Sequence, residues 1–447
     1  PNCGGVPDNM GMSAWQHMPG IDCLMNQYRE DTHAQFGNVR MVREVTSLCN
    51  QLGRKRFLCE LYGAGGWDLR FEDMKRIGDW LEVLGVNLLD EHLSYVTLRG
   101  ARKADHPQSF SYHEPWWDSY HAVAGYFTRL TAAMTQGEQV NDILVLEPTA
   151  AAWMYQGPSN PAGRLGEIGK SFFDLLMSFE AAQLEYDLGC EDVMARHGSV
   201  VEKGGPPRAG LPRLVVGKRQ YAYVILPPHT ETVNAKTMDL LEAFVKAGGW
   251  VFCCGPAPAL VDGKPSDRGA ALAKRETWRQ VDPQRTGPLP IAAAICRGGT
   301  VVERAVGDKG ILFHHRRELA DGDLLLLVNT SLDQPSQGTI RSVRSGVERF
   351  DLHTGKIAPL AFRKPAKKIG NVEFAYDLPP CGSLLVFLSK EKIKPAAELP
   401  ATTTPIAAAG PPTVRRIGPN VLTLDCLDVT AGGESLKGAY LDRKSVV

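Results

Sequence analysis

The sequence has no excess of either charge and no long apolar run. Lys plus Arg and Asp plus Glu each number 50 in 447 residues, so the formal net charge is zero. Nucleic acids and anionic membranes select basic surfaces, and neither is expected as a partner. No apolar run reaches the roughly 18 residues of a membrane span, and the opening PNCGGVPDNMGM lacks the basic start and apolar core of a signal peptide. The chain is expected to be soluble; its compartment, cytoplasmic or secreted, stays open.

Paired cysteines of the metal-binding kind are also missing. The chain has ten cysteines and none of them forms a CxxC pair, which argues against zinc ribbons and thioredoxin-like redox sites. Reduced cysteines that pack as small apolar side chains are the simpler interpretation. No metal site is assigned from these residues.

What the sequence does contain is an alternation of strand and helix patterns over the first 115 residues. Residues 38–52 and 70–84 carry apolar side chains at helical spacing, and each run ends at a glycine. RFLCEL precedes the second helix, VNLLDEHL follows it, and HMPGID (17–22) is a further candidate strand. This βαβ order predicts parallel strands joined by crossover helices. An aromatic-rich loop, 94–117, then leads to a helix over about 116–135.

A second α/β unit is predicted from residue 139 to 290. NDILVLEP, YAYVILPP and WVFCCGP are its buried strands, and 170–185 and 234–247 its helices. The unit has neither GxGxxG nor GxxxxGK[ST], so no dinucleotide or phosphate loop is expected.

The helical period ends near residue 293. Runs such as GILFHHR, DLLLLVNTS, VEFAYDLP and GSLLVFLS alternate with turn residues, which predicts an antiparallel β-sandwich over 291–390. A Pro/Ala/Thr-rich linker is expected over 391–418, and NVLTLDCLDV suggests that a further β domain starts within 419–447. Because the sequence does not start with Met and stops soon after that run, we expect a piece of a larger protein.

One charged residue stands out in the buried runs of the first segment. FLCELYGAGGWD places Glu60 at the end of a strand, directly before Tyr62, three glycines and Trp67. A desolvated carboxylate is costly unless it is paired or functional. Three strands are too few for an eight-stranded barrel, so a barrel would have only its last three strands within 1–138. Acids at the carboxyl ends of barrel strands face the substrate, and aromatic rings beside them suit sugar rings.

The stretch RFLCELYGAGGWDLRFEDMKRIGDWLEVLGVNLL, followed by SFSYHEPWW, resembles the last two strands of the (β/α)8 barrel of clan A-like glycoside hydrolases. It is most similar to the family 106 α-L-rhamnosidases and their relatives. The segment YAYVILPPHTETVNAKTMDLLEAFVKAGGWVF resembles the flavodoxin-like domain that follows the barrel there and in family 42 β-galactosidases. The resemblance covers about residues 18–256. It implies a glycosidase acting on an oligosaccharide or other glycoside, with the multidomain fold of a (β/α)8 TIM barrel, a flavodoxin-like domain and a β-sandwich.

By position, the resemblance makes Glu60 one of two catalytic carboxylates. It would be the general base of an inverting rhamnosidase, or the nucleophile of a retaining β-galactosidase. The general acid has no counterpart in these residues, so we expect this polypeptide alone to be inactive. Family 106 suggests a Ca²⁺ ion, whose ligands the sequence does not assign. The substrate-binding candidates are Tyr62, Trp67, His92, Tyr95, His113, Trp116 and Trp117.

Each candidate also has a structural interpretation. Glu60 could pair with Arg54, Lys55 or Arg56, but these stand at the other end of its strand, which favours catalysis. His92 and His113 could be hydrogen-bonded structural histidines, and the two tryptophans could fasten the following helix. The weaker acid candidates are Asp22, Asp90 and Glu91, and strand alternation lets only one of the last two face the site. A non-catalytic carbohydrate-binding or assembly protein, with homo-oligomer contacts through the flavodoxin-like domain, remains the rival hypothesis.

Overall fold

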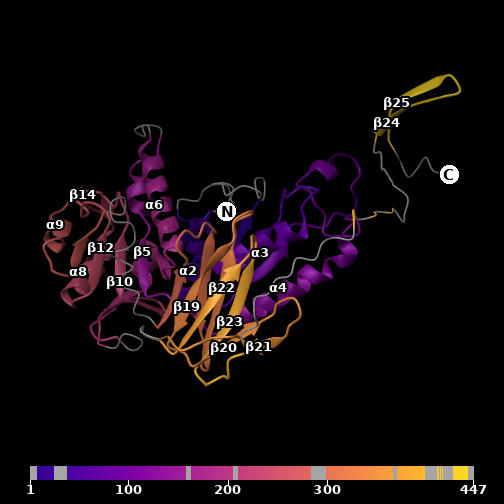
Figure 1. Ribbon diagram of the computed structural model, residues 1–447. Coiled ribbons are helices and arrows are strands. Elements are labelled where there is room, and N and C mark those ends of the chain that lie inside the picture. The colour runs from indigo at the N-terminus through magenta and orange to yellow at the C-terminus, as the bar shows by residue number, and fades with distance from the viewer. Residues whose placement is uncertain are drawn as a thin grey trace.

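The computed structural model describes residues 8–24, 38–157, 163–204, 210–282, 299–365, 370–397 and 426–440, with positions 410, 411, 413 and 415. It is a mixed α/β structure with several separate sheets (Figure 1). Among these residues, no helix combines the length and apolar character needed to cross a membrane. Most of the predicted linker, 391–418, and residues 420–425 of the last predicted strand lie outside the described residues.

The first segment forms a three-stranded parallel sheet in the order β1-β2-β3. Its strands are β1 (Gly20–Cys23), β2 (Leu58–Leu61) and β3 (Leu88–Glu91), joined by α2 (Val39–Leu52) and α3 (Phe71–Leu84). The two helices confirm the helical spacing of the sequence. Each ends where a glycine takes up the left-handed conformation, Gly53 with φ 67° and Gly85 with φ 119°.

The segment after residue 94 leads to α4 (His121–Met134), which packs on α3. It contains two short 3₁₀ turns, η1 (Gly100–Ala104) and η2 (Trp117–Ser119). The helix predicted over 116–135 is therefore split into a 3₁₀ turn and α4.

The second α/β unit contains a five-stranded parallel sheet in the order β15-β12-β10-β5-β6. In chain order the strands are β5 (Ile143–Leu146), β6 (Tyr186–Gly189), β10 (Tyr223–Leu226), β12 (Trp250–Cys253) and β15 (Trp278–Gln280). This is the 2-1-3-4-5 order of flavodoxin-like folds. Every residue of β5, β6 and β10 is buried, as expected for a parallel sheet covered on both faces.

The helices of this unit are α5 (Thr149–Trp153), α6 (Arg164–Ala181), α7 (Glu191–His197), α8 (Ala235–Lys246) and α9 (Arg268–Leu272). The helix predicted over 170–185 starts six residues earlier in the structure and ends four residues earlier, as α6. It stops at Ala181 because the chain turns at Gln183, where φ is positive, before β6 starts. Two small sheets flank the unit, β7-β8-β9 (Gly198–Val201, Arg213–Val216, Arg219–Tyr221) and β11-β13-β14 (Thr232–Val233, Leu260–Val261, Lys264–Pro265).

The third part consists of two antiparallel sheets that share one apolar core. The smaller contains β16 (Thr300–Arg304), β19 (Ser336–Ser342) and β22 (Val372–Leu378). The larger has the order β21-β20-β23-β18-β17-β4, with β4 (Glu138–Gln139), β17 (Leu312–Glu318), β18 (Gly322–Asn329), β20 (Gly346–Phe350), β21 (Ile357–Pro359) and β23 (Ser383–Ser389). A last hairpin, β24 (Cys426–Ala431) and β25 (Glu434–Tyr440), stands apart from the rest of the ribbon in Figure 1.

Helices of the first segment fasten these parts together. α2 lies against β6, where Ser47 Oγ accepts from Leu188 N and Gln51 Nε2 donates to Leu188 O, both at 2.8 Å. α3 and α4 lie against the larger antiparallel sheet, and their side chains form a common core with Phe313, Leu324 and Leu385. A short N-terminal helix, α1 (Asn9–Ser13), packs on α2 and α7. Through α2 the three-stranded sheet is attached to the five-stranded unit, and through α3 and α4 it is attached to the larger antiparallel sheet.

Candidate active site

Three carboxylates lie side by side across the three-stranded sheet. The register pairs Glu60 of β2 with Asp22 of β1 on one side and with Asp90 of β3 on the other. Residues paired in register on parallel strands project to the same face. Glu60 and Asp22 are half-buried and Asp90 is exposed. The structure therefore brings Glu60, Asp22 and Asp90 together near the carboxyl ends of the strands.

The opposite face of the sheet is apolar and closed. Cys23 and Cys59 are 0% exposed and belong to the core formed with α2 and α3. Burial raises the pKa of the Cys59 thiol well above its usual value, with neighbouring Cys23 as a second cause. A nucleophilic role for Cys59 is thus disfavoured by its position and by its protonation.

Within the described part of the chain, the Glu60 carboxylate has no hydrogen bond or ion pair. Of the three basic residues that precede β2, Arg54 donates to Ala14 O at 3.0 Å and Arg56 to Asn87 O at 3.2 Å, while Lys55 is exposed. None of them forms a salt bridge with Glu60. The described residues therefore give no support to the interpretation of Glu60 as half of a buried ion pair.

Glu91, the other acid of β3, points the opposite way. Its Oε1 accepts a 2.6 Å hydrogen bond from the Tyr120 hydroxyl. Burial and this carboxylate raise the pKa of Tyr120 well above its usual value. Strand alternation leaves Asp90 as the acid that lies beside Glu60, and Glu91 as an anchor for the segment that leads into α4.

The turn after β2 buries Tyr62, which the sequence had placed in a sugar-binding wall. Tyr62 is 1% exposed, its hydroxyl donates to Met74 O at 3.0 Å, and its ring stacks on Phe110 at 5.5 Å between centroids. Its φ of 70° turns the side chain away from the direction that strand alternation predicts. Tyr62 is therefore a core residue in this structure.

Gln108 is a buried residue that the sequence did not single out. It is 0% exposed, and its Nε2 donates to the carbonyls of Tyr62 and His92, at 3.1 and 3.4 Å. One side chain thus joins the turns that follow β2 and β3. Nothing in the sequence around Gln108 marks this role, because its partners lie 46 and 16 positions away.

The remaining polar candidates are spread around this edge. His92 directly follows β3 and is half-buried, and its Nδ1 has no partner among the described residues. Trp67 is 38% exposed and donates from Nε1 to Lys103 O at 2.7 Å. Tyr95 donates from its hydroxyl to Asp105 O. His113 Nδ1 lies 2.8 Å from Ser111 Oγ, as expected for a hydrogen-bonded structural histidine.

Trp116 and Trp117 belong to an aromatic cluster around Tyr120. Trp116 meets Phe71 and Phe110 edge to face, and Trp117 stacks on Tyr120 with 5.7 Å between centroids. These contacts fasten the aromatic-rich loop to α3 and α4, as the structural interpretation of the two tryptophans requires. Trp117 is still 39% exposed, and Trp116 is half-buried.

No calcium site is assigned among the described residues. No group of three or more His, Cys, Asp or Glu side chains in the described ranges is arranged to hold a metal ion, and the row of Asp22, Glu60 and Asp90 is included in that search. No chemical step is therefore assigned to a metal here.

No protein-family model matches the sequence, and no curated protein matches it at significant similarity. The fold, in contrast, is similar to known structures. A rhamnosidase from Novosphingobium sp. PP1Y is 16% identical with a TM-score of 0.66, and the match covers 89% of this chain and 37% of that one. A catalytic mutant of a GH42 β-galactosidase from G. stearothermophilus is 10% identical with a TM-score of 0.56, covering 86% of this chain and 61% of that one. The chain thus spans 37% of the rhamnosidase and 61% of the β-galactosidase, less than two thirds of either, and shares their fold over most of its own length.

Proposed function

We propose that this chain is part of a glycoside hydrolase that removes a terminal sugar, with α-L-rhamnosidase as the preferred activity. The observation that carries the proposal is Glu60, a carboxylate at the carboxyl end of a parallel strand that has no hydrogen bond or ion pair within the described ranges, with Asp22 and Asp90 beside it. We further propose that β1, β2 and β3 are the last three strands of a (β/α)8 barrel. The likeness to the rhamnosidase fold over 89% of the chain supports this assignment.

In this proposal Glu60 is one of two catalytic carboxylates. As a general base it takes a proton from water while the water oxygen attacks the anomeric carbon, and a second carboxylic acid protonates the departing oxygen. Trp67, His92, Tyr95 and Trp117 are proposed to contact the sugar, because each has an exposed or half-buried ring. Trp116 and His113 fit a supporting role better, since both are held by neighbouring side chains.

The test is turnover by the full-length protein on p-nitrophenyl α-L-rhamnoside. Glu60→Gln should lower kcat by about 10²- to 10⁴-fold with an unchanged circular dichroism spectrum, because the side chain keeps its size and loses its basicity. Glu276→Gln is the matched control, as Glu276 is exposed and lies in the second α/β unit. Near wild-type kcat in Glu60→Gln would overturn the assignment.

A retaining β-galactosidase is the second candidate. In that case Glu60 would act as the nucleophile, and the acid would lie on another strand of the barrel. The fold similarity to a GH42 β-galactosidase supports this candidate. Activity on p-nitrophenyl β-D-galactoside, with proton NMR of the first anomer released, separates the two candidates.

A non-catalytic carbohydrate-binding or assembly protein is the candidate from another class. It would use the five-stranded unit for contacts between copies of the chain. A Glu or Asp at the end of a fourth barrel strand in the full-length protein favours the enzyme, and its absence favours binding alone. Sedimentation of the chain over a range of concentrations measures the proposed contacts.

A further inference from the structure

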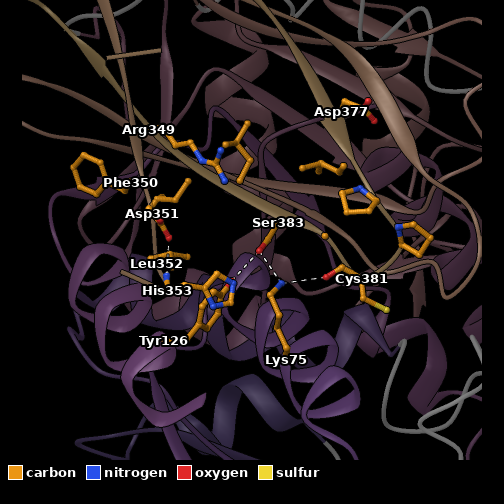
Figure 2. Close-up of a pocket in the computed structure, with 16 residues that line it drawn as sticks. Lys75, Tyr126, Arg349, Phe350, Asp351, Leu352, His353, Asp377, Cys381 and Ser383 are labelled. Carbon is orange, nitrogen blue, oxygen red and sulfur yellow. Dashed lines mark hydrogen bonds between the residues drawn. The ribbon is translucent and has the colours of Figure 1, made fainter. Parts of the chain in front are cut away.

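A cavity of about 360 Å³ lies where α3 and α4 meet the larger antiparallel sheet. Its lining comes from parts of the chain far apart in sequence: Lys75 of α3, Tyr126 of α4, the end of β20 with the turn after it, and the segment that links β22 to β23. Figure 2 shows these side chains arranged around one opening. The cavity includes none of Asp22, Glu60 and Asp90 and lies on the sheet side of α3.

The floor of the cavity is a closed hydrogen-bond network. Lys75 Nζ donates to Asp79 Oδ2 at 2.6 Å, to Ser383 Oγ at 2.9 Å and to Cys381 O at 3.1 Å. The Tyr126 hydroxyl lies 2.8 Å from both Asp79 Oδ1 and Ser383 Oγ. An ammonium has three donors and all are used here, so the floor is rigid and the charge of Lys75 is balanced by buried Asp79.

The turn after β20, which lines the edge of the cavity, is also held by hydrogen bonds. The Asp351 carboxylate accepts from His353 N at 2.9 Å, from Thr354 N at 3.2 Å and from Thr354 Oγ1 at 2.7 Å. From α4, Arg129 Nη1 donates to Leu352 O at 3.0 Å. The His353 ring rests against Tyr126 with 5.0 Å between ring centroids. The cavity is therefore shaped before any ligand arrives, which lowers the entropic cost of binding.

Three side chains of the lining keep unused hydrogen-bonding capacity. Within the described residues, the Arg349 guanidinium and the His353 ring nitrogens have no hydrogen bond or ion pair. The only side-chain bond of Asp377 there is at Oδ1, from Gln337 Nε2 at 3.1 Å. In Figure 2, Arg349 and His353 lie on one side of the opening and Asp377 on the other. The cavity thus offers donors and an acceptor from opposite walls.

The rest of the lining is largely apolar, and the charges nearly cancel. Lys75 pairs with Asp79 at 2.6 Å, and hydrogen bonds from Thr354 are the main cause that lowers the pKa of Asp351, with a smaller contribution from Arg349. The apolar surface comes from Phe350, Leu352, Leu378, Pro379, Pro380 and Leu384. Pockets that bind small molecules combine apolar walls with a few fixed polar groups, and this volume is at the lower end of their range. A ligand that fits must be small, uncharged, apolar on one face and rich in hydroxyls.

We propose that this cavity is a second, non-catalytic saccharide site that takes one neutral sugar ring, with Arg349, Asp377 and His353 binding its hydroxyls. The apolar wall then contacts the C–H face of the ring. The saccharide site goes beyond the proposed glycosidase activity and does not need Glu60. The two proposals can therefore be tested independently.

The experiment uses the 447-residue chain and NMR titration with methyl α-L-rhamnoside and methyl β-D-galactoside. At least one neutral glycoside should bind saturably with a millimolar Kd and shift the His353 Cε1 proton, a signal assigned by its loss in His353→Ala. Arg349→Ala and Asp377→Ala should each weaken binding about tenfold, because each removes a charge-assisted hydrogen bond.

Arg363→Ala is the control: Arg363 is an exposed arginine of the same antiparallel part, pairs with Glu373 and lies outside the cavity. It should leave the affinity unchanged. Binding that persists in both Arg349→Ala and Asp377→Ala, or no saturable binding, would overturn the site. Tighter binding of D-glucuronate or D-glucosamine than of the neutral glycosides would overturn the ligand class.

Discussion

Arg43 and Glu180 form a buried, two-pronged ion pair between α2 and α6. Arg43 Nε lies 2.9 Å from Oε1 and Nη2 lies 3.0 Å from Oε2, and both side chains are under 5% exposed. The Tyr186 hydroxyl also donates to Oε1 at 2.7 Å. The pair joins the helix between β1 and β2 to the five-stranded unit, and so holds the sheet that carries Glu60.

We predict that Arg43→Met destabilises the chain by about 3–5 kcal/mol, because it leaves the Glu180 charge buried without its partner. Glu180→Gln should cost a similar amount. The double variant should cost clearly less than the sum, which urea unfolding measures as a coupling energy. Lys170→Met breaks an exposed pair with Asp174 on the same helix and should cost under about 1 kcal/mol. Additive effects at Arg43 and Glu180 would contradict the coupling.

We predict that Glu82 of α3 makes the free energy of unfolding depend on pH. It is fully buried and accepts from Thr131 Oγ1, while its Oε2 has no partner among the described residues. Burial, with a smaller contribution from Asp79, raises the pKa of Glu82 from 4.5 to about 8. Between these values the native state holds a proton that the unfolded state has lost. Stability should therefore fall as pH rises from about 5 to 8, by up to about 1.4 kcal/mol per pH unit from this group.

Glu82→Gln imitates the protonated form and should remove this part of the pH dependence. The variant should gain stability relative to wild type at pH 8 and little at pH 5, as measured by urea unfolding at each pH. Glu276→Gln, at an exposed position, should leave the slope as it is. Identical slopes in wild type and Glu82→Gln would contradict the assignment.

Gln108 is predicted to position the catalytic edge. Gln108→Leu removes the bonds to the Tyr62 and His92 carbonyls while nearly keeping the volume, so the turns after β2 and β3 should shift. In the full-length protein kcat should fall about 10- to 100-fold with a smaller change in KM. Gln108→Met, which cannot donate and has a similar length, should behave like Gln108→Leu. A kcat within twofold of wild type in either variant would refute this role.

Much of the local structure could be predicted because it depends on spacing within a short stretch. The apolar period of residues 38–52 and 70–84 gave α2 and α3, and alternation correctly separated Cys59 from Glu60 and Asp90 from Glu91. The register then adds what no single strand reveals, namely that Asp22, Glu60 and Asp90 align. That alignment depends on pairing between strands about 30 to 40 positions apart.

The misjudged residues share a different cause. Tyr62 was expected beside a sugar, but a positive φ in the YGAGG turn sends its ring into the core. The sequence does not indicate which non-glycine residue of such a turn will adopt a positive φ. The sequence also did not single out Gln108, Glu180 or Arg349. The roles of Gln108 and Glu180 depend on hydrogen-bond partners far away in sequence, and that of Arg349 depends on a cavity that only tertiary packing forms.

The most direct test of the central claim is chemical rescue of Glu60→Ala in the full-length protein, measured as turnover of p-nitrophenyl α-L-rhamnoside and β-D-galactoside with and without sodium azide. If Glu60 is a catalytic carboxylate, the variant should be nearly inactive, and azide should restore turnover and yield the glycosyl azide, because a small anion occupies the space of the missing side chain. Asp90→Ala should show no such azide product. Wild-type turnover in Glu60→Ala, or an inactive variant that azide fails to rescue on both substrates, would contradict the account.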